Sequence, residues 1–248
     1  MCPAASRVTS EQRELLIGKY FAVLVFLLLF SNHPLNNYRD THFAMAGLVV
    51  FSQPSLWLSA ASIIFNPTFW NIAARTEYHN KTLTKLAGGK PLYGCYGLAA
   101  TIFCLGIVRD MIYERALRTQ PAHPLMQGPL AQALAVALIG SGNTLVLSSM
   151  WALGITGTYL GDYFGILMDE MVTGFPFNVT GSPMYWGSTM SFAGTALWFG
   201  KPAGLLLTAL VFVAYKIALS FEDPFTSEIY AKRERERAAA KNGGKKAQ

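Results

Sequence analysis

Two adjacent carboxylates stand directly after a long apolar stretch in this 248-residue chain. The stretch runs from Ala203 to Phe221, and Glu222 and Asp223 follow it. A helix needs about 20 apolar residues to cross the hydrocarbon core, so the pair is expected where lipid gives way to water. Neighbouring like charges repel, and carboxylates at a helix C-terminus oppose its dipole. This placement suggests a cationic or hydroxyl-rich ligand, with a solvated helix end as the alternative.

A second motif consists of small residues inside the longest apolar block, residues 130–154. Gly140, Ser141 and Gly142 form a Gly-x-Gly step there. Missing side chains would let a ligand lie against the backbone, but small residues also let two membrane helices approach closely. A lone Gly-x-Gly is a weak signal, so by itself the motif favours the packing interpretation.

The segment Gly157 to Glu170 is too polar and glycine-rich for a membrane span, and it is unusually aromatic for a loop. Aromatic residues often anchor a protein at the membrane interface. The alternative is a headgroup pocket, in which aromatic faces surround a methylated ammonium through cation–π contacts. The residues expected around such a group are Tyr159, Tyr163, Phe164, Tyr185 and Trp186. The four histidines and three cysteines show no metal-ligand spacing, so no metal site is expected.

The composition assigns these motifs to a membrane protein. Hydrophobic residues make up 52% of the chain and charged residues 14%, against about 25% charged residues in soluble domains. The net charge of +6 arises mainly in loops and a basic tail between apolar blocks, which suits anionic lipid headgroups better than nucleic acid. The blocks lack the alternation of a membrane barrel, so we expect an all-α integral membrane protein, a multi-span helical bundle.

Six apolar blocks are candidates for membrane-embedded helices. They comprise residues 15–31, 43–65, 91–108, 130–154, 184–200 and 203–221. The first suits a signal-anchor, and the second contains Pro54, so it could span with a kink or dip into the membrane and return. Lys201-Pro202 separates the last two blocks as a turn signal, which predicts a tight helical hairpin.

Two topologies follow from these blocks. In the hairpin version, loops 66–90 and 155–183 lie on the side of the C-terminus and collect most of the basic residues. In the other version, block 184–200 does not span, and loop 66–90 moves to the opposite side from the tail. The positive-inside rule favours the hairpin version with a cytosolic C-terminus.

Three parts are expected along the chain. Residues 1–40 form an N-terminal extension with the signal-anchor, residues 41–230 the membrane-embedded domain, and residues 231–248 a basic cytosolic tail. The tail is expected to be a surface helix that stops at Asn242-Gly243-Gly244. The last four residues, Lys245 to Gln248, are similar to a dilysine address for the endoplasmic reticulum, with a merely basic tail as the alternative.

Six strings in order over roughly residues 65–230 carry a family resemblance. They are FNPTFWNIAARTEYH from Phe65, LVLSSMWALGITGTYLGDYFGILMDE from Leu145, VTGFPFN from Val172, PMYWGST from Pro183, KPAGLL from Lys201 and EDPFTSEIY from Glu222. With these strings the chain resembles the phospholipid N-methyltransferases, most closely their fungal branch. The resemblance implies methylation of phosphatidyl-N-methylethanolamine and phosphatidyl-N,N-dimethylethanolamine, and of phosphatidylethanolamine as a further substrate, to phosphatidylcholine. The methyl donor it implies is S-adenosylmethionine.

The resemblance also implies which residues bind the cofactor. They are Gly140, Ser141, Gly142, Glu222, Asp223 and Tyr185. Asp223 departs from the family's usual second glutamate and shortens the reach by one methylene. The Pro183-x-Tyr185-x-Gly187 core is similar to the cofactor region of the isoprenylcysteine carboxyl methyltransferases, which implies a related helical fold.

The reaction that the resemblance implies needs a neutral lipid amine. Such an amine is mostly protonated at neutral pH, because its pKa resembles the ~10.4 of lysine. Three carboxylates are candidates to accept the proton: Asp162, Glu170 and Glu222. The expected location is the endoplasmic reticulum membrane, with a mitochondrial membrane as a second location. Carboxyl methylation of prenylated cysteine and non-catalytic lipid binding are the competing functions.

Overall fold

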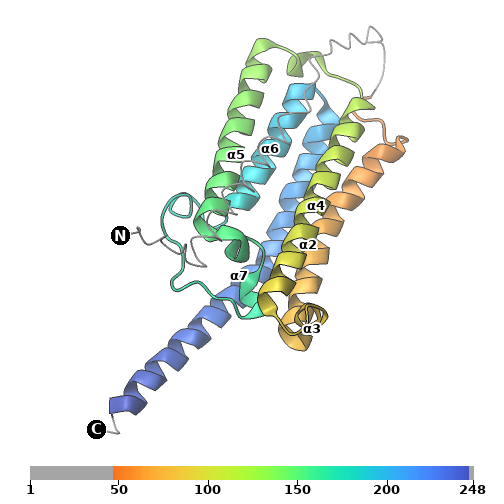
Figure 1. The fold of residues 1–248 in the computed structure, drawn as a ribbon. Coiled ribbons are helices and arrows are strands. Elements are labelled where there is room, and N and C mark those ends of the chain that lie inside the picture. Colours follow the sequence, from red (N-terminus) through yellow and green to blue (C-terminus); the bar gives the residue numbers. More distant parts are fainter. Residues whose placement is uncertain (1–46, 246–248) are drawn as a thin grey trace, which may run out of the picture.

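The structure, a computed structural model, describes residues 47–245. Throughout this part of the chain the regular elements are helices, as predicted (Figure 1). They are α2 (Pro54–Asn80), α3 (Thr82–Leu86), α4 (Pro91–Arg118), η1 (Pro124–Met126), α5 (Pro129–Thr158), η2 (Gly161–Phe164), α6 (Pro183–Phe199) and α7 (Pro202–Lys245). Three stretches are long and apolar enough to cross a membrane, namely Pro91–Arg118, Pro129–Phe164 and Pro202–Arg237.

Each long helix begins at a proline. The first turn of a helix tolerates proline because its missing N–H would have no partner within the helix, and its fixed φ angle already suits the helix. Pro54 therefore corrects the prediction for block 43–65, because it opens α2 instead of kinking a helix that started earlier. α2 also continues to Asn80, so much of the expected loop 66–90 is helix. The signal-anchor at 15–31 lies outside the described residues.

The long helices run alternately up and down the bundle (Figure 1). One end therefore gathers α3, the segment 159–182 and the C-terminal half of α7. The predicted hairpin between the last two apolar blocks is confirmed. α6 ends at Phe199, and Gly200 follows as its C-cap with a left-handed φ of 66° that suits glycine. α7 then begins at Pro202. Segments of both loops thus lie at the end of the bundle that carries the tail. The membrane topology itself stays a prediction.

α7 corrects the prediction for the tail. It is one helix of 44 residues, so the basic tail is not a separate surface helix and does not stop at residues 242–244. Glu222 and Asp223 consequently lie in the interior of a helix and not at its C-terminal end. The Lys, Arg, Glu and Ala residues that follow are strong helix formers, and this explains why the helix continues beyond the apolar block.

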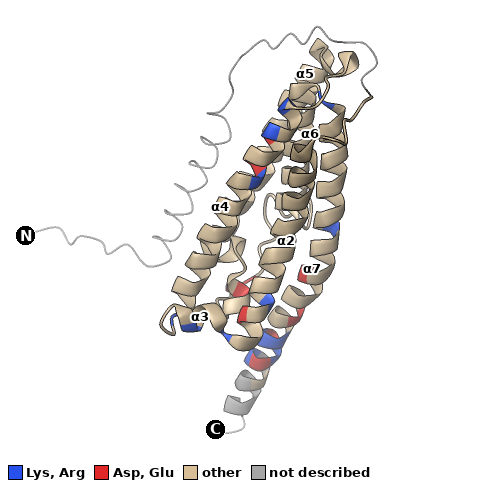
Figure 2. Ribbon diagram, turned by 90° about the vertical axis from the view of Figure 1, so that its right-hand side faces the viewer, with Lys and Arg blue, Asp and Glu red and all other residues tan. Residues whose placement is uncertain are grey.

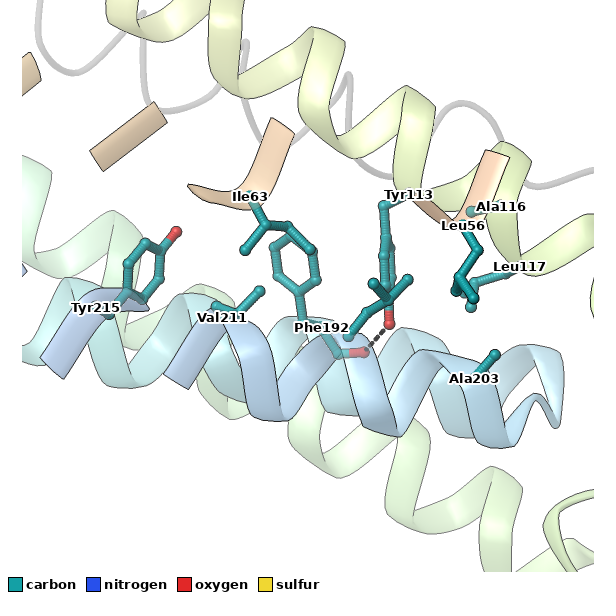
Figure 3. Packing of buried hydrophobic residues seen from close by; sticks show 10 residues of the cluster. Leu56, Ile63, Tyr113, Ala116, Leu117, Phe192, Ala203, Val211 and Tyr215 are labelled. Atoms are coloured by element: carbon teal, nitrogen blue, oxygen red, sulfur yellow. Dashed lines mark hydrogen bonds between the residues drawn. The ribbon is translucent and has the colours of Figure 1, made fainter. Parts of the chain in front are cut away.

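The core lies where α2, α4, α6 and α7 meet (Figure 3). Leu117 packs there beside Ala203, and both side chains are fully buried. The hydroxyl of Tyr113 donates to the backbone carbonyls of Phe192 at 3.0 Å and Gly204 at 3.2 Å. One side chain of α4 is thereby fixed to both arms of the α6–α7 hairpin. These contacts make α4 and the hairpin one rigid frame for the site below them.

Candidate functional site: an acidic cavity around Glu222

A cavity of about 1090 Å³ runs between α4, α5, α6 and α7, and the segment 159–182 lines one end of it. Five acidic side chains lie on its otherwise mainly apolar lining. They are Asp110, Glu114, Asp162, Glu222 and Asp223. Arg109 is the one basic residue among the described residues that line it. The cavity is therefore suited to a ligand that carries positive charge.

Glu222 is buried at this cavity and is held by three hydrogen bonds from two other helices. Trp70 Nε1 and Asn71 Nδ2, both on α2, donate to its Oε1 at 2.8 and 2.7 Å. The hydroxyl of Tyr185 on α6 donates to its Oε2. A carboxylate offers about four acceptor positions, so one position remains for a ligand. The carboxylate is thus fixed in place, and its charge faces the cavity.

The acidic pair and the tyrosine of the Pro-x-Tyr-x-Gly core come together on this lining. Asp223 is exposed, lines the cavity beside Glu222 and makes none of the hydrogen bonds that hold its neighbour. Tyr185 lines it too, and its ring meets that of Tyr215 edge to face, with centroids 4.9 Å apart. Of the six residues expected to bind the cofactor, these three line the cavity.

The Gly-x-Gly step lies elsewhere on α5 and does not line the cavity. A Cβ atom added to Gly140 would meet nothing within 4 Å, and both Gly140 and Ser141 are exposed. Gly142 instead packs against α6, where an added Cβ would lie 2.5 Å from the backbone oxygen of Gly187. The next residue, Asn143, does line the cavity. The expected contact of the step with the cofactor stays a prediction.

The two glycines of that contact come from two different motifs. Gly187, of the Pro-x-Tyr-x-Gly core, faces Gly142 across the contact between α5 and α6. A Cβ atom added to either glycine would lie 2.5 Å from the backbone oxygen of the other. Small residues at such a helix contact let the two backbones approach closely. The contact places Asn143 on α5 and Tyr185 on α6 on one wall of the cavity.

The three candidate proton acceptors lie in different environments. Asp162 lines the cavity, and its two oxygens accept hydrogen bonds from the Thr226 hydroxyl at 2.8 Å and the Tyr163 backbone N–H at 3.1 Å. Thr226, which binds Asp162, lies one helical turn beyond Glu222 on α7. Glu170 is exposed and does not line the cavity.

The structure does not bring the five expected aromatic residues around one site. Tyr159 and Tyr185 line the cavity. Trp186 is 44% exposed and packs on Phe212. It follows Tyr185 directly, and consecutive residues of a helix point in different directions, so Trp186 does not line the cavity that Tyr185 lines. The other two aromatic residues, Tyr163 and Phe164, are buried in side-chain packing next to the cavity.

Three residues of the site were missed by the sequence analysis. Trp70 and Asn71 lay in an expected loop, although they stand inside one of the matching strings. Arg109 was assigned to a loop after the apolar block 91–108, whereas α4 continues to Arg118. The signal that could have found it is the charged run that starts at Arg109, whose residue types favour continuation of a helix.

Comparison with known proteins identifies the chain's relatives. The family model described as phospholipid methyltransferase matches residues 130–233. A phosphatidyl-N-methylethanolamine N-methyltransferase of Neurospora crassa is 64% identical over 198 residues, which cover 80% of this chain and 92% of the relative. The protein of the same name in Saccharomyces cerevisiae is 64% identical over 178 residues, or 72% of this chain and 86% of the relative. The chain belongs to the phospholipid methyltransferase family.

More distant relatives agree with this membership. A human phosphatidylethanolamine N-methyltransferase is 46% identical over 186 residues, which cover 75% of this chain and 93% of the relative. No match was found among solved structures. The family match covers nearly all of α5, η2, α6 and the greater part of α7. Of the site residues, Asp162 lies on η2, Tyr185 on α6 and Glu222 on α7. In this phospholipid methyltransferase, α2 and α4 complete the site with Trp70, Asn71 and Arg109.

Proposed function

We propose that the protein transfers methyl groups from S-adenosylmethionine to the amines of phosphatidyl-N-methylethanolamine and phosphatidyl-N,N-dimethylethanolamine, with phosphatidylcholine as the final product. The observation that carries the proposal is the buried Glu222, held by Trp70, Asn71 and Tyr185 at an acidic cavity within a helical bundle. Relatives that are 64% identical are named after the first of these two substrates, phosphatidyl-N-methylethanolamine.

The donor set of the cavity fits S-adenosylmethionine. This cofactor carries a sulfonium, an ammonium and ribose hydroxyls, all of which are attracted to carboxylates or hydrogen-bond to them. When bound, it would supply an electrophilic methyl group. We place Glu222 on its ammonium or ribose hydroxyls, because one acceptor position of that carboxylate is not used by the protein. Tyr185 and Asp223 line the same cavity.

The Gly-x-Gly step contributes to the site in one of two ways. The resemblance places Gly140, Ser141 and Gly142 on the cofactor, and we retain that as a proposal. The packing of Gly142 against Gly187 favours an indirect role, in which the close approach of α5 and α6 brings Asn143 to the cavity wall. Substitution of Gly140, which no neighbour crowds, distinguishes these roles.

Asp162 is the carboxylate that we propose as the proton acceptor. The three donors around Glu222 occupy most of its lone pairs, and Glu170 does not line the cavity. Asp162 lines the cavity near Glu222 and keeps acceptor positions beyond its two hydrogen bonds. An amine held there can lose its proton to Asp162 or to a water between them before it attacks the methyl group. Holding both substrates in one cavity supplies much of the remaining rate.

Lipid access is proposed between α4 and α5. In Figure 1, α6 is seen between α5 and α4. α4 and α5 make few contacts with each other, whereas α5 and α6 pack extensively. Apolar residues of both helices line the cavity at this side, among them Ile107 of α4 and Met150 of α5. A lipid could therefore enter with its chains still in the bilayer.

We place the protein in the endoplasmic reticulum membrane with a cytosolic C-terminus, and a mitochondrial membrane remains a second location. Basic residues at the end of the bundle that holds α3 and the tail support this orientation (Figure 2). Water-soluble cofactor would then reach the cavity from the cytosol. The dilysine-like end supports the reticulum, although residues 246–248 of it lie outside the described residues. The three-part division at residues 40 and 230 also stays a proposal, and α7 crosses the second boundary without a break.

The substrate is tested by comparing three lipids in nanodiscs that hold the purified protein. We expect mono- and dimethylated phosphatidylethanolamine to give a higher kcat/KM than the unmethylated lipid. The reason is that aromatic side chains at the cavity, such as Tyr159 and Trp70, favour a partly methylated ammonium by cation–π contact. Equal or faster turnover of the unmethylated lipid would contradict this choice of substrate.

A further inference from the structure

Arg109 is a buried cation inside the helical bundle, directly after the apolar block 91–108 of the membrane-spanning helix α4. Its side chain is 12% exposed, and Nε and Nη2 lie 2.9 and 2.8 Å from Oδ1 of the adjacent Asp110. Nη1 donates to the Tyr215 hydroxyl at 2.7 Å, and the guanidinium lies 4.9 Å from the centroid of the Phe192 ring. Ionisable residues inside membrane bundles are costly, and as a rule they serve a function.

These contacts leave part of the guanidinium free to bind a ligand. The group has five N–H donors, and three of them are used by Asp110 and Tyr215. One donor remains on each of Nη1 and Nη2, the two ends of the fork that matches the paired oxygens of a phosphate or carboxylate. Arg109 lines the cavity. The fork is therefore held in position and has two donors to offer.

The rest of the lining is unsuited to an anion, because its other charged residues are five carboxylates. Both substrates of the proposed function nevertheless carry an oxyanion, the lipid as its phosphodiester and the methyl donor as its carboxylate. An anion buried in such a cavity without a cationic partner would be strongly unfavourable. We propose that Arg109 is the oxyanion-binding residue of this cavity and binds one of these two groups. This proposal rests on the proposed function.

The position of Arg109 relative to Glu222 fits this role. Tyr215, which binds Arg109, precedes Glu222 by seven residues of α7, or about 10 Å along the helix axis. The ring of Tyr215 also meets that of Tyr185, which binds Glu222. The cavity thus presents the carboxylate of Glu222 and the guanidinium of Arg109 at different positions along the axis of α7. Both candidate ligands have the complementary polarity, with a cationic nitrogen at one end and an oxyanion near it.

The competing explanation is an ion pair that only stabilises α4, and two variants separate the explanations. If Arg109 binds an oxyanion, Arg109→Gln weakens binding, whereas Asp110→Asn leaves binding unchanged or tightens it, because Asp110 competes with the ligand for the guanidinium. If the pair is only structural, the two variants lose stability and activity alike. Arg118→Gln is the matched control, since Arg118 is an exposed arginine on the same helix, paired with Glu114.

The experiment measures two quantities on purified protein in nanodiscs. Isothermal titration gives the Kd of S-adenosylhomocysteine, which retains the carboxylate of the donor, and steady-state assays give the KM of phosphatidyl-N-methylethanolamine. Loss of a charge-assisted hydrogen bond predicts a weakening of roughly 10- to 100-fold in one quantity for Arg109→Gln. A rise confined to the lipid KM assigns the phosphodiester, and a rise in the Kd assigns the carboxylate.

Arg109→Lys keeps the charge without the fork, so it should fold and show a smaller loss than the glutamine variant. The proposal is overturned if both quantities stay at wild-type values in the Gln and Lys variants, if kcat alone falls, or if Asp110→Asn loses binding as Arg109→Gln does. A wild-type protein that methylates no lipid would instead contradict the proposed function. This outcome differs from those above, because they compare variants with an active wild type.

Discussion

At the scale of single residues, the site depends on how Glu222 is kept charged yet buried. A carboxylate removed from water is stable only when hydrogen bonds or opposite charges replace its hydration. Trp70, Asn71 and Tyr185 supply those hydrogen bonds and leave the charge uncompensated. The remaining negative charge can be matched only by a ligand or by solvent that enters the cavity. This is the physical reason why a cationic cofactor suits the position.

The sequence identified some of these residues and not others, for reasons that are specific to each. Glu222 stood out because a charge after a long apolar block marks the membrane boundary. Trp70 and Asn71 did not, because their roles depend on α2 packing against α7, a contact between residues 151 or more positions apart. Arg109 was missed because hydropathy marks where an apolar block ends, whereas helix α4 continues ten residues beyond Val108.

At the scale of elements, the close contact of α5 and α6 decides the shape of the cavity. Hydropathy predicted both helices, and the composition of block 130–154 predicted small residues at a helix contact. It could not show which of the two glycines faces the partner helix. That depends on the rotation of α5 about its axis, which the packing of Gly142 on Gly187 fixes. Gly140, two residues earlier, points away from that contact.

This geometry predicts different consequences for the two glycines. Gly142→Ala should lower the thermal stability of the protein, because its Cβ would lie 2.5 Å from a backbone oxygen of α6. Overpacking of this kind costs about 1–3 kcal/mol. Gly140→Ala should be tolerated, since nothing lies within 4 Å of the added carbon. Thermal unfolding in detergent, followed by tryptophan fluorescence, measures both.

The larger substitution Gly140→Leu tests the proposed contact with the cofactor. If Gly140 acts only as part of the α5 surface, the leucine variant binds S-adenosylhomocysteine with wild-type affinity. A variant that folds, inserts and fails to bind would instead show that the cofactor lies against Gly140. Titration of the purified variant with S-adenosylhomocysteine decides between these outcomes, with Gly140→Ala as the control for loss of glycine alone.

At the scale of the whole molecule, the up-and-down order of the helices places the loops of the site at the end that carries the tail. Two glycosylation sequons lie at this end, one at Asn80 and one at Asn178, and both asparagines are exposed. If the tail is cytosolic, neither can be glycosylated, because sugar is added on the lumenal side. We therefore expect endoglycosidase treatment to leave the mobility of the protein unchanged.

A mobility shift that is lost in Asn80→Gln or Asn178→Gln would reverse the proposed orientation. Because a sequon close to the membrane can escape modification, an acceptor sequon carried on a longer inserted loop should be tested at each end of the bundle. Under the proposed orientation, the acceptor between α4 and α5 is glycosylated and the one inserted after Asn178 is not.

The central claim is that lipid is methylated in the cavity around Glu222. The direct measurement incubates membranes containing wild-type protein, Glu222→Gln or Asp223→Asn with methyl-labelled S-adenosylmethionine and phosphatidyl-N-methylethanolamine. We predict label in phosphatidylcholine for the wild type, and at least about a tenfold fall for Glu222→Gln at equal protein level, from loss of a charge-assisted hydrogen bond. Asp223→Asn should lose less, because Asp223 is exposed. Label in protein, absence of label in lipid, or full activity of Glu222→Gln would contradict the account.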